Sequence, residues 1–183
     1  MWIYLVTSMP SEVKKIFANQ SGFAALRHDG LLVSWGDPKG RTLSDVDQVA
    51  STSRAWAALC GGRVVTWGHE DHGASAAASE LRGVRKVYGN RFAFAAVLAG
   101  GQVAAWGPKE HGGDCGAVAA QLSGVQHIEA ASSAFAAITL KSSVDAKRSG
   151  VQVRLTSTVV AWGDPRLGGD SSGASERKRL GKL

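Results

Sequence analysis

Apolar residues along the chain follow neither a helical period nor a simple strand alternation. Short apolar runs of the form aromatic-Ala-Ala-aliphatic recur, and a glycine-containing turn comes after most of them. A short run in which neighbouring positions are both apolar is typical of a strand that is buried on both faces. These runs occupy residues 23–26, 56–59, 94–97 and 135–138.

The sequence around these runs repeats at further positions. A valine lies ten residues before each aromatic residue, and a second β-branched residue follows three positions after that valine. Downstream of each run, an apolar pair precedes a Trp-Gly dipeptide. Agreement of four copies at all these positions indicates internal repetition, which decides the fold class before any site is considered. The repeated aromatic positions, which we expect to be structural, are Phe23, Trp56, Phe94 and Phe135, and then Trp35, Trp67, Trp106 and Trp162.

Each copy predicts three short strands. The second strand is the aromatic run, and the third ends at the Trp-Gly pair. Asp-Gly or Gly-Gly stands between these two strands in the first three copies, as a tight hairpin requires. The segments after Trp-Gly are rich in alanine and predict a helical turn or an irregular return. The first strands are expected at residues 13–18, 46–51, 84–89 and 125–130.

The predicted fold is therefore all-β, with tandem repeats of short three- to four-stranded antiparallel sheets. About four β-propeller-like blades would form an incomplete or open ring, with a β-solenoid-like stack as the alternative. An ordinary sandwich would leave the repetition as a coincidence. The predicted organisation is an N-terminal segment (1–12), four repeats (13–45, 46–83, 84–124 and 125–170) and a Ser/Gly-rich then basic tail (171–183).

The fourth repeat contains an insertion near residues 142–157, where the other copies have a short turn. Its alternating Val151, Val153 and Leu155 are compatible with an extra strand. A functional loop, a disordered insertion and a faulty gene model stay open as interpretations.

The order Val-x-x-Ile, Phe-Ala-Ala-Leu, Asp-Gly or Gly-Gly, then Val-Val-x-Trp-Gly resembles the repeat of the regulator of chromosome condensation family. The short spacing of the copies is similar to that of the bacterial propeller-type β-lactamase inhibitor protein. The resemblance covers about residues 13–170 and implies a propeller that offers its loops to a protein partner. Related proteins include guanine-nucleotide exchange factors, HECT-type ubiquitin ligases and secreted inhibitors. The family usually closes its ring with seven blades, whereas this chain has four repeats.

Composition narrows the function classes. The chain has 183 residues, and no apolar run approaches the roughly 20 residues needed to span a membrane. No secretory signal is recognisable, so we expect a soluble cytoplasmic protein, with the nucleus as the alternative. Cys60 and Cys115 cannot make a disulfide framework, and two free thiols are favoured over one bridge. The net charge of +6 is concentrated after residue 140, so nucleic acid would bind weakly and only through the basic tail.

The loops after Trp-Gly carry the candidate chemistry. Histidines and carboxylates there could bind zinc in principle, but the equivalent loops of the first and fourth copies have no histidine. The Gly-Gly-Asp turns could hold calcium, but they more simply supply the backbone freedom for passing from one blade to the next. No nucleophile or phosphate-loop motif occurs. We therefore expect no enzyme activity, no cofactor and no metal. The candidate partner-binding residues are Asp37, Lys39, His69, Glu70, Asp71, His72, Lys109, Glu110, His111, Asp114, Asp164, Arg166 and Asp170.

These observations favour a non-enzymatic protein–protein interaction module, a repeat scaffold that presents variable loops to a protein partner. The alternatives are a chromatin-associated or guanine-nucleotide exchange regulator of the chromosome condensation type, or a blade fragment of a HECT-type ubiquitin ligase. Four blades would leave two blade edges exposed, which predicts self-association as a further property.

Overall fold

The computed structural model describes residues 13–36, 39–147 and 150–172. These residues form four small antiparallel sheets that follow one another in chain order. The first sheet contains β1 (Val13–Asn19), β2 (Gly22–Arg27), β3 (Leu32–Gly36) and β4 (Thr42–Leu43), and the second contains β5 (Val46–Ser51), β6 (Ala55–Cys60) and β7 (Arg63–Gly68). The third sheet contains β8 (Val84–Gly89), β9 (Phe94–Leu98) and β10 (Val103–Trp106), and the fourth contains β11 (Val125–Ala130), β12 (Ala134–Lys147) and β13 (Gly150–Gly163).

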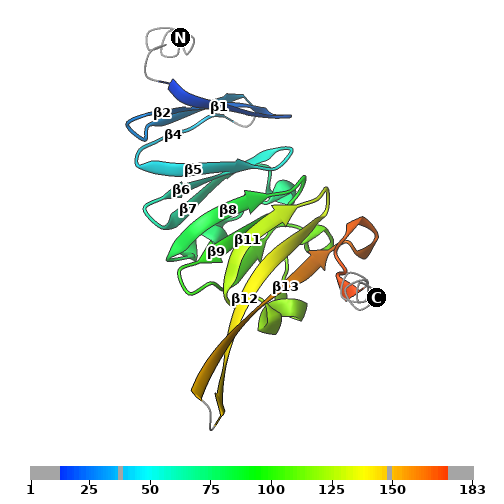
Figure 1. Cartoon of the computed structure of the whole chain (residues 1–183). Coiled ribbons are helices and arrows are strands. Elements are labelled where there is room, and N and C mark those ends of the chain that lie inside the picture. Colours follow the sequence, from blue (N-terminus) through cyan, green and yellow to red (C-terminus); the bar gives the residue numbers. More distant parts are fainter. Residues whose placement is uncertain (1–12, 37–38, 148–149, 173–183) are drawn as a thin grey trace.

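The sheets lie side by side in an open row, with the first sheet at one end and the fourth at the other (Figure 1). This arrangement confirms the predicted all-β class, the repeated antiparallel sheets and the open ring. The first sheet departs from the three-stranded pattern because the short strand β4 pairs with the outer edge of β3. The segments after Trp-Gly form short 3-10 helices: η1 (Glu70–His72), η2 (Ala76–Glu80), η3 (Lys109–His111), η4 (Gly116–Gln121) and η5 (Pro165–Leu167).

The aromatic-Ala-Ala-aliphatic run is the middle strand of each sheet, and both of its faces are used in stacking. In β9, Phe94 and Ala96 pack towards the second sheet, whereas Ala95 and Val97 pack towards the fourth. Alternation of side chains along a strand separates these two sets, and both sets are apolar because both faces are covered. The alanines leave room for the large side chains of the adjacent sheet.

Each middle strand pairs its aromatic residue with the tryptophan that ends the outer strand, as in Phe94 opposite Trp106. The two rings stack in all four sheets, with centroids between 5.4 and 6.1 Å apart. In the third and fourth sheets the indole also reaches the preceding repeat: Trp106 Nε1 donates to Gly73 O (3.1 Å) and Trp162 Nε1 donates to Gly112 O (3.0 Å). Each of these tryptophans therefore ties its own sheet to the loop of the sheet before it.

The first strand of every sheet carries the same irregularity. The pairing register shifts immediately after the leading valine, between Val13 and Lys15 and at the three equivalent places. A bulge of this kind adds one unpaired residue and increases the local twist of the strand. The repeat therefore preserves a backbone feature that no single residue type marks in the sequence.

Gln48, two residues after the valine of the second sheet, links that sheet to the third. Its Nε2 donates to Val87 O (2.6 Å) and its Oε1 accepts from Val87 N (3.0 Å). The side-chain amide thus acts as one more rung between two strands that belong to different sheets. This link was missed by the sequence reasoning because the equivalent positions hold Lys15, Lys86 and His127.

We expect Gln48→Met to lower the free energy of unfolding by about 1–3 kcal/mol, because both Val87 backbone groups lose their partner. Urea denaturation measures this change. Lys86→Met, at the equivalent exposed position of the third sheet, is the control and should stay within about 0.5 kcal/mol of the parent protein. Equal losses in the two variants would contradict the role given to the amide.

The insertion in the fourth repeat extends the sheet. Pairing between β12 and β13 continues from Leu140 opposite Ser157 to Lys147 opposite Gly150, so the two strands form a long hairpin beyond the stack (Figure 1). The backbone of the insertion therefore follows the extra-strand pattern that the alternating Val151, Val153 and Leu155 suggested.

The hairpin turns differ more than the sequence pattern indicates. The second sheet has a two-residue turn, with Gly61 and Gly62 both at positive φ (53° and 79°) between the paired Cys60 and Arg63, whereas longer turns join β2 to β3 and β9 to β10. Both central residues of such a turn need this conformation, which glycine adopts without strain. Cys60 is therefore the last residue of a strand and lies outside the turn proper.

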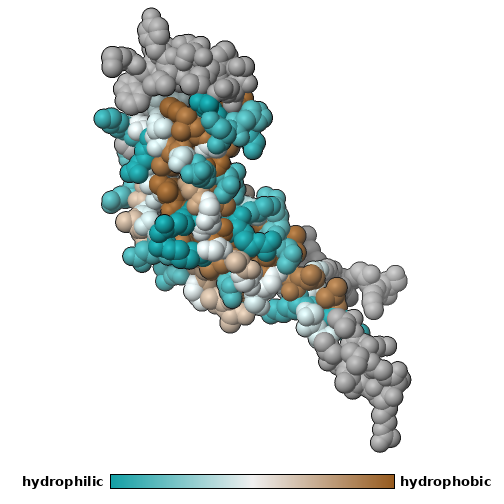
Figure 2. All heavy atoms as spheres, turned by 90° about the vertical axis from the view of Figure 1, so that its left-hand side faces the viewer, coloured by the Kyte–Doolittle hydropathy of each residue, from teal (hydrophilic) through white to brown (hydrophobic). Residues whose placement is uncertain are grey.

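Polar and apolar residues are interspersed over the sheets on the face drawn in Figure 2, where the apolar surface descends the row in patches. None of the described helices has the length and apolar character that crossing a membrane requires.

The two cysteines are free and half-buried. Burial raises the pKa of both thiols, so neither has the low pKa of a reactive cysteine.

Candidate partner-binding face

The segments that follow Trp-Gly gather along one side of the row. The outer strand of each sheet ends beside the start of the middle strand, so the turn that begins the middle strand lies on the same side. We call this side the loop face. Among the described residues it comprises the turns 20–21, 52–54, 90–93 and 131–133 and the segments 69–75, 108–116 and 164–172.

The loops on this face share one backbone design. In each of the last three repeats a three-residue 3-10 helix is followed by a glycine, six positions after the tryptophan, in the left-handed conformation. These glycines are Gly73, Gly112 and Gly168, with φ of 91°, 88° and 98°. The helices themselves read Glu-Asp-His, Lys-Glu-His and Pro-Arg-Leu. The backbone geometry is therefore constant while the exposed side chains change from loop to loop.

Two of the loops meet across a turn of the third sheet and form a row of rings. The ring of His72 lies 5.3 Å from that of Phe92, and Phe92 stacks on His111 with centroids 4.1 Å apart. His69 continues the row, 6.4 Å from His72, and the guanidinium of Arg91 lies 5.3 Å from the Phe92 ring. The structure thus brings together three predicted histidines from two separate loops.

Phe92 is the residue of this row that the sequence reasoning missed. It lies two positions before the repeated aromatic residue, where the other copies have Ser21, Arg54 and Ser133. A pattern based on agreement between copies gives no weight to such a position. The signal available in the sequence was the departure itself, a large aromatic residue at a turn position that is polar in every other copy.

Several predicted acidic residues shape the loops. His72 Nδ1 lies 2.9 Å from Asp71 Oδ1, and this hydrogen bond lowers the pKa of the Asp71 carboxyl. The Gly116 amide, and then Lys109 at 3.2 Å, lower the pKa of Asp114. Arg166 lowers the pKa of Asp164, whose side chain also caps η5. These carboxylates are thus already engaged within their own loops.

The remaining predicted residues are placed differently. Glu70 and Glu110 are exposed, and neither makes an ion pair within the part of the chain that the structure describes. Lys39 is exposed beside Trp35 at the first sheet, whereas Asp37 lies outside the described residues. Asp170 accepts hydrogen bonds from the amide and hydroxyl of Ser172, which lower its pKa. Glu70 and Glu110 are therefore the acidic groups of the loop face that are open to a partner.

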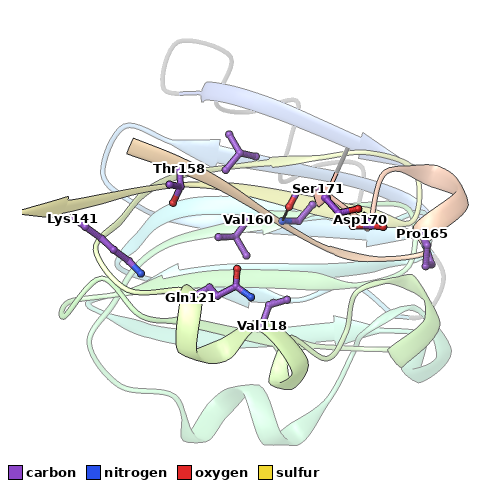
Figure 3. A pocket seen from close by; sticks show the side chains of 12 residues that line it. Val118, Gln121, Lys141, Thr158, Val160, Pro165, Asp170 and Ser171 are labelled. Carbon is purple, nitrogen blue, oxygen red and sulfur yellow. Dashed lines mark hydrogen bonds between the residues drawn. The ribbon is translucent and has the colours of Figure 1, made fainter. Parts of the chain in front are cut away.

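A separate groove runs along the outer edge of the fourth sheet. It has a volume of about 600 Å³ and lies between β13 and η4 of the preceding repeat. Figure 3 shows Val118 and Gln121 of η4 across from Val160, with Lys141 and Thr158 towards one end and Asp170, Ser171 and Pro165 towards the other. Ser171 Oγ accepts from Ala161 N at 3.3 Å, so the strand edge is partly closed by the chain itself. Asp170 is the predicted partner-binding residue that falls in this groove.

Within residues 13–36, 39–147 and 150–172, no three His, Cys, Asp or Glu side chains gather as metal ligands would. Asp114 accepts from Gly116 N and pairs with Lys109, so its carboxylate is engaged within its own loop. The loop face can present half-buried rings and exposed charges on a rigid frame.

Comparison with known proteins bears on the fold. No family model matches the sequence, and no curated protein matches it. Human WBSCR16 is similar in structure, with a TM-score of 0.52 and 16% identity over 85% of this chain and 48% of its own. Prp20p from Saccharomyces cerevisiae is similar with a TM-score of 0.57 and 13% identity over 86% of this chain and 46% of its own.

These solved structures are proteins of the regulator of chromosome condensation family, so the fold is that of their β-propeller. The likeness favours the propeller-blade prediction over the solenoid-like alternative. This chain spans about half of the length of the two propellers. At this level of identity the likeness concerns the fold alone.

Proposed function

We propose that this chain is a non-enzymatic interaction module that holds a protein partner against its loop face. The observation that carries the proposal is the combination of a constant loop backbone with side chains that vary between copies. Loops held on a rigid scaffold are the usual place for binding residues. Aromatic rings and arginines are also the groups that dominate protein interfaces.

The row of rings is the centre of the proposed contact. Phe92 is half-buried, so it offers a rigid apolar surface that loses little conformational entropy when it is covered. Arg91 beside it and the exposed Glu70 and Glu110 supply charges of both signs around the rings. An apolar centre with a charged rim is the general anatomy of a protein interface. The yeast neighbour supports a protein as the ligand, because its structure was described together with its binding to Gsp1p and histones.

We expect the triple variant Glu70→Ala, Phe92→Ala and Glu110→Ala to lose its partner while it stays folded. The test is an affinity capture of the tagged full chain from source-cell lysate, with nuclease added and mass spectrometry as the readout. A captured protein should fall by about tenfold or more in the variant, because interface anchors each contribute about 2 kcal/mol or more.

The matched control changes three exposed residues on the side of the row opposite the loop face: His28→Ala, Arg63→Ala and Gln102→Ala. This variant should capture the partner as the parent protein does. Circular dichroism establishes that both variants are folded. Undiminished capture by the loop-face variant, or equal losses in both variants, would exclude the loop face as the binding surface.

A second candidate is a regulator of the exchange-factor kind, supported by the binding of Gsp1p and histones by Prp20p. It predicts that the purified chain accelerates release of a labelled guanine nucleotide from a small GTPase, and that the loop-face variant does not. Release at the uncatalysed rate with every GTPase tested would leave the binding module as the function.

A further inference from the structure

The exposed large hydrophobic side chains of the described residues all lie at the two ends of the row. The second and third sheets contribute none. In repeat proteins the terminal units normally turn a polar face outward. Both end faces here are apolar instead, as an uncovered sheet-to-sheet interface would be. The residues are Ile16, Phe23, Ile138, Leu140, Leu155, Val159 and Leu167.

The outward face of the fourth sheet carries the positions that are covered elsewhere. Ile138 pairs with Val159, and the two side chains are 46% and 51% exposed. The equivalent pair in the third sheet, Val97 and Val103, packs beneath the fourth sheet, and Val97 is 4% exposed. Alternation along the strands places Leu140 and Leu155 on the same outward face, so the apolar strip continues along the long hairpin.

The outward face of the first sheet is the complementary surface. Ile16 is 60% exposed and Phe23 is 47% exposed. Every equivalent residue in the other sheets is 7% exposed or less, because the preceding sheet covers it. These buried equivalents are Val49, Val87 and Ile128 for Ile16, and Trp56, Phe94 and Phe135 for Phe23.

Backbone groups at the two ends are complementary as well. A ladder of hydrogen bonds joins successive turns of the loop face: Gln20 N donates to Ser53 O (2.9 Å), Ser53 N to Arg91 O (3.0 Å) and Arg91 N to Ser132 O (3.3 Å). Within the described residues, Ser132 N has no acceptor. The acceptors of this ladder are carbonyls at one repeated position, and the residue at that position in the first repeat is Gln20. The Gln20 carbonyl of a second copy would therefore continue the ladder.

Gly168, at the fourth-sheet end of the row, borders a space that no side chain of the described residues fills. A Cβ added at Gly73 or Gly112 would meet the ring of Phe94 or Phe135 of the next sheet, at 2.8 and 2.9 Å. Gly168 has the same left-handed conformation, yet nothing lies within 4 Å of its Cβ position. In the other repeats this space is filled by the repeated aromatic residue of the next sheet, Phe94 or Phe135. The equivalent ring that is left to fill it is Phe23 of a second copy.

We propose that two copies of this chain assemble head to tail, with the fourth sheet of each copy covered by the first sheet of the other. The three interfaces inside the chain show what covers such a face: an aromatic ring, a β-branched side chain and a backbone acceptor. Among the described residues, the first sheet has an aromatic ring, a β-branched side chain and a backbone acceptor of this kind that are not covered. Such a contact joins two different surfaces, so it forms either a closed ring or an open filament.

The length of the propeller neighbours favours a closed ring of two. The chain covers 48% of WBSCR16 and 46% of Prp20p, so two copies have about the length of one such propeller. A symmetric ring of two buries all four end faces and leaves the loop face of each copy accessible. The proposal therefore stands independently of the partner-binding function.

Light scattering on the full chain, eluted from a sizing column over a range of concentrations, tests the assembly. We expect twice the 19.1 kDa mass of one chain. Ile138→Asp removes one interacting face and Phe23→Asp removes the other, and each variant alone should be a monomer. Ala77→Asp, an exposed change on η2, is the matched control and should remain a dimer.

Mixing the two monomeric variants distinguishes this contact from a symmetric contact between like faces. The mixture retains one intact pair of faces, so a complex of two chains should reappear. A parent chain that is monomeric at every concentration overturns the proposal. It is also overturned if Phe23→Asp still dimerises, because the fourth sheet would then bind itself or another surface.

Discussion

Phe135→Ala is expected to lower the free energy of unfolding by about 3–5 kcal/mol, measured by urea denaturation at low protein concentration. The ring is 1% exposed and stacks on Trp162, and it lies in the core between the third and fourth sheets. Its removal leaves a cavity among rigid neighbours, since the adjoining alanines cannot extend to fill the space.

The matched control for this loss is Phe23→Ala, at the same position of the first repeat. Phe23 stacks on Trp35 in the same way but is 47% exposed. In the monomer we expect a loss of about 1 kcal/mol or less, because most of the packing around the ring is absent. Equal losses at the two positions would contradict the stacking order of the sheets. Low concentration keeps the end faces free of a second copy.

Gly112→Ala is expected to lower the free energy of unfolding by about 2–5 kcal/mol. Part of the loss is backbone strain, about 1–2 kcal/mol, because φ is 88°. The rest comes from overpacking, typically about 1–3 kcal/mol, because the new Cβ would lie 2.9 Å from Phe135 Cδ2. Phe135 is fully enclosed, so the ring cannot move aside cheaply.

Gly168→Ala separates these two contributions. Its φ of 98° imposes the same kind of strain, but the added Cβ would meet nothing within 4 Å. We expect a loss of only about 1–2 kcal/mol in the monomer. Thermal or urea unfolding of both variants under the same conditions provides the comparison. A Gly112→Ala variant as stable as Gly168→Ala would show that the loop does not pack against the next sheet as described.

Much of the fold follows from local properties of the repeat. The spacing of Phe94, Gly101 and Trp106 marks a strand, a turn and a second strand, since both strand burial and turn conformation depend on residues close in the chain. Repetition added what a single copy lacks, because four agreeing copies predict sheets that are covered by one another on both faces.

Other features were beyond local patterns. The Gln48 link joins residues 39 positions apart, and its equivalents in the other repeats are different amino acids. The same is true of Phe92, whose ring bridges two loops although the position is polar in the other copies. A contact that only one repeat makes cannot be recognised from a pattern that is defined by agreement between the repeats.

The sequence by itself determined the all-β class, the four repeated units, the buried middle strands and the variable loops after Trp-Gly. Only the tertiary structure decided that the rings of three loop histidines and Phe92 lie next to one another. It also decided that the side chains of Ile16, Phe23, Ile138 and Val159 remain uncovered. The physical reason is that the repeat specifies what each sheet offers to its neighbours. Whether a neighbour is present depends on the place of the sheet in the row.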